Sequence, residues 1–78
     1  MIRRITGTAV EVHPTHTVID VAGIGYLVYT TAHAAIVHGE KTTLFTHLAV
    51  RENALDLYGF TKQEDLAFFE HLLTLPKQ

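Results

Sequence analysis

The sequence predicts a mainly β chain that closes into one small barrel and ends in a helix. Five stretches of alternating apolar and polar residues are typical of strands with one buried face. Glycine, proline and short polar segments separate these stretches, as expected of turns. After residue 60 the apolar spacing becomes that of an amphipathic helix. With a short helix expected between the third and fourth strands, these elements favour a five-stranded OB-fold barrel over an SH3-like barrel of similar strand count.

The first three strands are expected within the first 30 residues of the chain. Residues 2–12 are rich in β-branched side chains, and their alternation slips near Gly7. This slip predicts a bulge or bend at Gly7, which would allow one strand to serve both halves of a barrel. A proline-containing turn follows, and the second strand is expected over residues 17–21. A glycine-containing connection then leads to the third strand, over residues 26–30.

A hairpin over residues 45–60 is the clearest single feature of the sequence. Two alternating runs flank a short polar tip, which predicts antiparallel strands joined by a tight turn. Glu52 and Asn53 are expected at its apex, the most exposed point of a hairpin. His47 alternates with apolar neighbours and is expected to be hydrogen-bonded on the outer face of the barrel. Before the hairpin, residues 32–37 are expected to form the short helix.

The last part of the chain predicts a helix over residues 61–75. Thr61 and Glu64 have the spacing of a capping box, in which each side chain satisfies an amide of the first turn. Apolar residues then recur every three or four positions, at Leu66, Phe69, Leu72 and Leu73. We expect one domain, with an OB-like barrel over residues 1–60 and this helix packed on it or leading out of it.

Composition limits the classes of function. The 78 residues hold six Lys and Arg against eight Asp and Glu, a formal charge of −2 that is unusual for an autonomous DNA-binding domain. The chain has no cysteine, so disulfides and thiolate zinc sites are excluded, and a reducing cytoplasm is favoured. No apolar run reaches the roughly 20 residues of a membrane span, and no signal peptide is visible.

Catalytic motifs are not apparent. The six histidines have no metal-ligand spacing, and no metal or other cofactor is expected. The chain contains no phosphate-binding loop, no serine nucleophile and no pair of acids suited to acid–base catalysis. We therefore expect no ATPase, nuclease or helicase activity from the chain alone. The seven aromatic residues are expected mainly in the core, and the cations are scattered, which disfavours stacking of single-stranded nucleic acid.

Several motifs give the chain a resemblance to a known family. They are Met1-Ile2 with Arg4 and Gly7, Gly23-Ile24-Gly25-Tyr26 with Val28, Thr46-His47, Val50-Arg51-Glu52-Asn53, and Leu57-Tyr58-Gly59-Phe60. In this order and spacing they resemble the N-terminal domain of the bacterial Holliday junction branch-migration protein RuvA. Each motif alone is weak, but together they cover most of the chain.

The resemblance implies a fold and a function. RuvA-like proteins are homotetramers that hold four-way junction DNA open and load a hexameric branch-migration ATPase, in recombination, DNA repair and the SOS response. Their N-terminal OB-fold barrel carries an acidic pin at the junction centre, which implies this role for Glu52 and Asn53 and places Arg51 close to DNA. The carboxylate of such a pin repels phosphates and so opposes re-pairing of the strands.

Two departures from the family pattern stand out. Many members have two acids at the tip, whereas this chain has Glu52 followed by the uncharged Asn53. The helix-hairpin-helix motifs that grip DNA and the C-terminal module that contacts the ATPase are missing. We therefore expect an excised N-terminal domain or a truncated relative, with weak DNA binding of its own. The alternative function is a stand-alone OB-type module that binds single-stranded nucleic acid or another protein.

Overall fold

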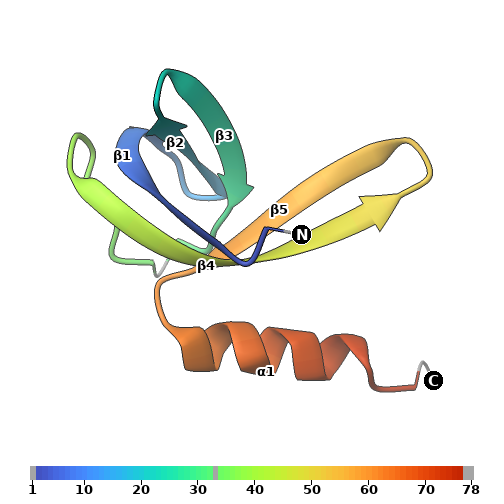
Figure 1. Cartoon of the computed structure of the whole chain (residues 1–78). Helices are drawn as coiled ribbons and strands as arrows, with labels where there is room; N and C mark the ends of the chain where they lie inside the picture. Colours follow the sequence, from blue (N-terminus) through green and yellow to red (C-terminus); the bar gives the residue numbers. More distant parts are fainter. Residues whose placement is uncertain (1, 33, 77–78) are drawn as a thin grey trace.

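Figure 1 shows the computed structural model of the chain, which describes residues 2–32 and 34–76. Its elements, in chain order, are β1 (Arg4–Val12), β2 (His16–Val21), β3 (Ile24–Tyr29), β4 (Lys41–Arg51), β5 (Ala54–Phe60) and α1 (Gln63–Leu73). The five predicted strands and the C-terminal helix are thus confirmed, with some ends displaced by a few residues.

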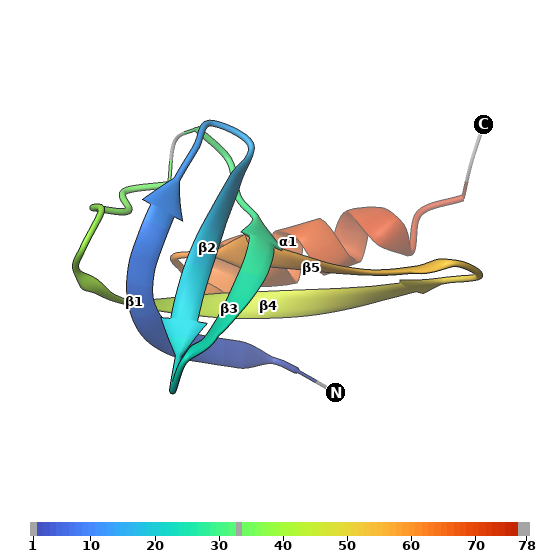
Figure 2. The same ribbon diagram turned by 90° about the horizontal axis from the view of Figure 1, so that it is seen from above.

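The strands form a closed barrel in the order β1-β2-β3-β5-β4. All neighbours are antiparallel except β3 and β5, which run parallel and meet only where Val28 and Tyr29 lie beside Leu57 and Tyr58. Figure 2 shows β1, β2 and β3 crossing over the β4–β5 hairpin. The predicted mainly β, OB-like architecture is therefore confirmed.

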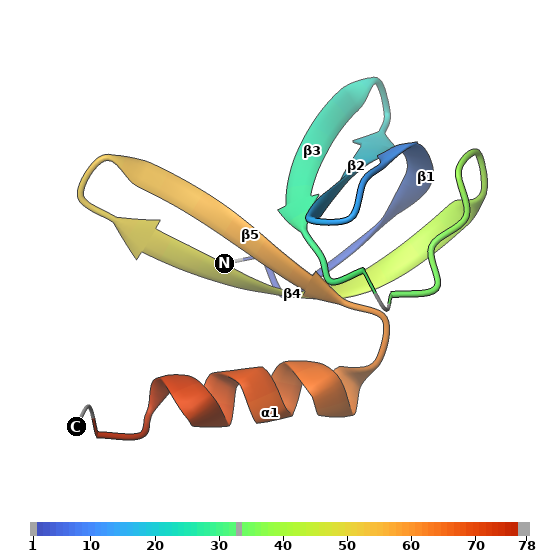
Figure 3. The same ribbon diagram turned by 180° about the vertical axis from the view of Figure 1, so that it is seen from behind.

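The outer part of the β4–β5 hairpin extends away from the barrel. Residues 49–56, called the arm below, pair with each other and, in the strand pairings described here, with no third strand. Figure 3 shows the arm projecting from the barrel, with α1 running beneath it. The molecule is consequently elongated, with principal extents of 41 × 27 × 20 Å.

Strand β1 takes part in both halves of the barrel, as predicted. It pairs with β4 through residues 4–8 and with β2 through residues 8–12. The irregularity lies between Ala9 and Glu11, so the bulge predicted at Gly7 is wrong in position. A Cβ atom at Gly7 would lie 2.3 Å from the backbone oxygen of Asp20. Glycine is thus required at this point because the two strands approach closely, which also explains why the alternation slips there.

The short helix predicted over residues 32–37 is wrong as far as the described residues show, His33 lying outside them. The described residues of this range form a turn, a bend and irregular backbone. The backbone nearby bonds to β1 instead: the N–H of Gly39 donates to the oxygen of Ala9 at 2.7 Å, and the N–H of Ala9 donates to the oxygen of Glu40 at 3.0 Å. Because a helix of so few residues is costly to nucleate, pairing with a neighbouring strand is favoured.

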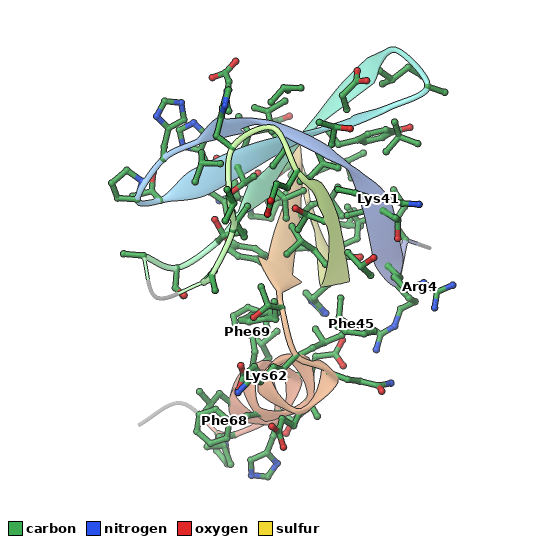
Figure 4. All side chains as sticks on the ribbon, turned by 90° about the vertical axis from the view of Figure 1, so that its left-hand side faces the viewer. Arg4, Lys41, Phe45, Lys62, Phe68 and Phe69 are labelled. Atoms are coloured by element: carbon green, nitrogen blue, oxygen red, sulfur yellow. The ribbon has the colours of Figure 1, made fainter. Side chains whose placement is uncertain are left out.

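The barrel core is aliphatic, contrary to the expectation that most aromatic residues would fill it. Its buried members are Ile5, Ala9, Ile19, Val28, Leu44 and Leu57. Tyr58, Phe60 and Phe69 instead pack together between β5 and α1. The ring centroid of Phe69 lies 5.3 Å from that of Tyr58 and 5.1 Å from that of Phe60. In Figure 4, Phe69 points from α1 toward the barrel, whereas Phe68 points away from it. The aromatic residues therefore fasten the helix to the outside of the barrel.

Helix α1 begins after Lys62, whose side chain makes no capping hydrogen bond. The predicted capping box of Thr61 and Glu64 is therefore wrong. Leu66 is buried and Phe69 packs on β5, whereas Leu72 and Leu73 are half-exposed, so the predicted apolar stripe leaves the barrel at its C-terminal end. In the described part of the chain, no helix has the length and apolar character needed to cross a membrane.

The turn between β2 and β3 predicts a stabilising substitution. Ala22 and Gly23 join the strands with φ angles of 53° and 89°, as in a type I′ turn. The left-handed conformation costs an ordinary residue about 1–2 kcal/mol, but asparagine tolerates it. Ala22→Asn should therefore raise the free energy of unfolding by about 0.5–1 kcal/mol in urea denaturation. The control is Ala35→Asn in the exposed connection before β4, and an equal gain there would contradict the explanation.

Candidate functional site

The β4–β5 hairpin keeps the predicted alternation of its two faces. Thr46 lies opposite Gly59 and Leu48 opposite Leu57, and the side chains of Thr46, Leu48 and Leu57 turn toward the interior of the barrel. On the other face His47 lies opposite Tyr58, next to α1. The same two faces continue along residues 49–56, so the tip is held by a regular antiparallel ladder.

The structure places Glu52 and Asn53 in a two-residue turn at the end of the arm. Arg51 and Ala54 are the last pair of the ladder and close this turn. Both turn residues are exposed, and Glu52 is the only acid of the two. The turn between β4 and β5 lies at one extremity of the molecule (Figure 1), so an exposed carboxylate in this turn meets any large partner that approaches the arm end-on.

Arg51 makes an ion pair that the sequence interpretation missed. Its Nη2 donates to Oδ2 of Asp56, whose side chain is only 14% exposed, against 66% for Arg51. With a two-residue turn, position 51 pairs with position 54, and position 56 then lies diagonally across on the same face. The spacing of five residues around a two-residue turn is the sequence signal that would have indicated this contact.

His47 belongs to a second charged cluster, between β4, α1 and the N-terminal segment. Its Nδ1 donates to Oε2 of Glu70 at 2.8 Å, which confirms the expected hydrogen bond on the outer face. The two terminal nitrogens of Arg3 donate to Glu70 at 2.5 and 3.1 Å. The hydrogen bonds from Arg3 are the largest cause, and that from His47 the second, of a pKa of Glu70 lowered to about 2. The contact with Glu70 in turn raises the pKa of Arg3. The cluster fixes α1 against the barrel at a point away from the tip.

The lowered pKa of Glu70 gives a pH dependence that can be measured. Because its folded pKa lies below the ordinary value of 4.5, ionised Glu70 stabilises the fold above about pH 4.5. That contribution is lost as the pH falls from 4.5 toward 2. Glu70→Gln should therefore lower the melting temperature at pH 7, and the difference from the parent chain should shrink on acidification. Glu40→Gln, in the loop before β4, is the control and should show no such convergence.

Among the described residues, the remaining polar groups do not gather into a metal centre. His13 contacts Glu11 at 3.1 Å and stacks on His16, but within the described ranges no three potential ligands gather in a metal-binding arrangement. A cavity of about 340 Å³ lies near the β1–β2 turn, and one of about 220 Å³ lies between the barrel and α1. Figure 4 shows Arg4 and Lys41 on one flank and Lys62 near the start of α1, so these cations are spread out.

Comparison with known proteins gives a consistent result. The family model described as RuvA N terminal domain matches residues 1–59. The chain is 45% identical over 78 residues to the Holliday junction branch migration complex subunit RuvA of Stutzerimonas stutzeri, covering 96% of this chain and 39% of the relative. The subunit of the same name from Alkaliphilus oremlandii is 37% identical over 79 residues, covering 99% and 41%. The chain thus spans about two fifths of the length of these curated relatives.

Proposed function

The chain belongs to the RuvA N-terminal domain family, and from this membership we propose that it is a non-catalytic part of a Holliday junction branch-migration complex. In this role it assembles into a homotetramer on four-way junction DNA during recombination and repair, in the cytoplasm. The observation that carries the proposal is the exposed Glu52 carboxylate at the end of an arm that extends away from the barrel. We therefore assign Glu52, with Asn53 beside it, as the pin.

The mechanism follows from charge. Each DNA phosphate carries a negative charge, so a carboxylate among four converging strands repels them. Four copies of this chain would bring four Glu52 charges to the centre, while Asn53 adds none. The rigid ladder behind the tip keeps that charge at a fixed position, which allows it to separate strands rather than follow them. ATP hydrolysis comes from a separate hexameric ATPase, held by a segment outside this sequence, and DNA grip comes from helix-hairpin-helix motifs also outside it.

A chimaera tests the proposal. This chain replaces the matching segment of the Stutzerimonas stutzeri relative, which supplies the remaining three fifths of the subunit. We expect the chimaera to bind four-way junctions more tightly than duplex DNA of equal length. The isolated chain should bind either DNA only weakly, with a dissociation constant of about 10⁻⁴ M or weaker at physiological salt. Junction affinity of the chimaera no better than duplex affinity, with the parent relative active in parallel, would refute the proposal.

Self-association should depend on the arm. Val50 and Leu55 lie opposite each other on it and are 70% and 68% exposed, which is costly for a pair of apolar side chains in water. Leu55→Asp should weaken association of the isolated chain at least about tenfold, since burying Leu at an interface contributes about 1.5–3 kcal/mol. Analytical ultracentrifugation over a concentration series measures this. Leu75→Asp, at an exposed leucine beyond α1, is the matched control, and a parent chain that stays monomeric at millimolar concentration would contradict the prediction.

A further inference from the structure

The ion pair next to the tip determines which charges the tip can present. Arg51 and Asp56 lie diagonally across the ladder, on the face of the arm that also carries Ala49 and Ala54. The Asp56 carboxylate is largely covered, whereas most of the Arg51 side chain is open to solvent. Arg51 therefore reaches back from the turn to a carboxylate that itself faces solvent very little.

This contact matters because arginine is the side chain best suited to hold a phosphate. A guanidinium group makes two parallel, charge-assisted hydrogen bonds to such an anion. An arginine directly before Glu52 would thus attract the same phosphates that Glu52 repels. Summed over Arg51, Glu52 and Asp56, the local charge is −1, whereas without Asp56 it is zero.

We propose that Asp56 sets the specificity of the tip by neutralising Arg51 and keeping it from DNA phosphates, so that Glu52 acts as an uncompensated carboxylate. The inference rests on the proposed function, since it concerns how the tip meets junction DNA. Asp56 is a positioning residue in this role: it acts through Arg51 and does not itself face the DNA. It also explains how one acid at the turn can suffice where Asn53 supplies no charge.

The test uses the chimaera with four-way junction DNA over a range of salt concentrations. Asp56→Asn keeps the shape of the side chain but frees Arg51, so junction affinity should rise by about threefold to tenfold at low salt. The plot of log affinity against log salt should become steeper, by up to about 0.9 for each phosphate that a freed arginine neutralises. Arg51→Gln should lower affinity, and the exchange of Arg51→Asp with Asp56→Arg should restore both parental values.

Separate outcomes distinguish this inference from the proposed function. Glu52→Gln reports on the pin alone: if it raises affinity while Asp56→Asn does not, only the inference fails. If Glu52→Gln changes nothing and the chimaera shows no junction preference, the proposed function fails and the inference fails with it. An Asp56→Asn variant that melts earlier but keeps the parental salt slope would show a purely structural ion pair and would overturn the inference.

Discussion

Replacing Gly7 with alanine should destabilise the chain more than any other single methyl group added to it. The new Cβ would lie 2.3 Å from the backbone oxygen of Asp20 and within 3 Å of the side chains of Ile19 and Val21. A backbone atom cannot rotate away as a side chain can, so β1 and β2 would have to separate where β1 passes from one half of the barrel to the other. Overpacking of this kind costs about 3 kcal/mol or more.

Such a loss is large for a chain of this length, whose total stability is about 4–12 kcal/mol. We expect Gly7→Ala to be partly unfolded at 37 °C and to show a much lower urea midpoint, followed by circular dichroism. Gly25→Ala is the matched control: it lies in β3, is exposed, and its Cβ would come only to 3.2 Å from a Val18 methyl group. It should cost less than about 1 kcal/mol. Equal midpoints for the two variants would show that the strands can move apart at little cost.

The second large effect is expected at the tip. Glu52→Lys changes the charge by two units per copy, or eight in a tetramer, at the point proposed to face the junction centre. Junction affinity of the chimaera should rise about tenfold or more at low salt, and the salt dependence should steepen because new cations neutralise phosphates. Strand separation during branch migration should be impaired. Glu52→Gln should show the same direction with a smaller size, while folding stability changes by no more than about 0.5 kcal/mol.

Glu40→Lys provides the control for Glu52→Lys. Glu40 directly precedes β4, at the end of that strand opposite to the tip. The substitution Glu40→Lys therefore makes the same change in net charge far from the tip. A similar gain in affinity from Glu40→Lys would mean that overall charge, rather than the pin, governs binding. Weaker junction binding by both Glu52 variants, in folded tetramers, would show that Glu52 does not act by repulsion.

The strands were predictable because apolar and polar residues alternate along them even in a chain this short. One face of each strand must be buried, and Leu44, Thr46, Leu57 and Gly59 follow that rule. The missing helix between β3 and β4 was not predictable, because the backbone just after it, at Gly39 and Glu40, bonds to Ala9 of β1, which is distant in sequence. The capping box also failed. The spacing of Thr61 and Glu64 permits its two hydrogen bonds, but the N-cap residue of α1 is Lys62, one position later than the box requires.

The position of the candidate site could be predicted, but its electrostatics could not. Alternation around a polar turn placed Glu52 and Asn53 at the apex. The partners of the neighbouring charged groups depend on register and on packing of the helix. Arg51 and Asp56 meet only because the turn has two residues, and Glu70 meets Arg3 only because α1 folds back along the barrel. The first contact is visible in the sequence only once the length of the turn is known, and the second leaves no signal in the linear pattern of residue types.

The narrow parallel contact between β3 and β5 has a consequence for how the barrel opens. It joins the strands only near Val28 and Leu57, whereas β4 and β5 pair continuously over residues 45–51 and 54–60. Local opening begins where the fewest hydrogen bonds must break, so this seam should separate before the rest of the chain unfolds. The barrel then becomes an open sheet with β3 and β5 as unpaired edges, which are templates for strand exchange between copies. Amide hydrogens at the seam should therefore exchange with solvent faster than those of β1 and β4, and concentrated solutions of the isolated chain should be prone to domain swapping.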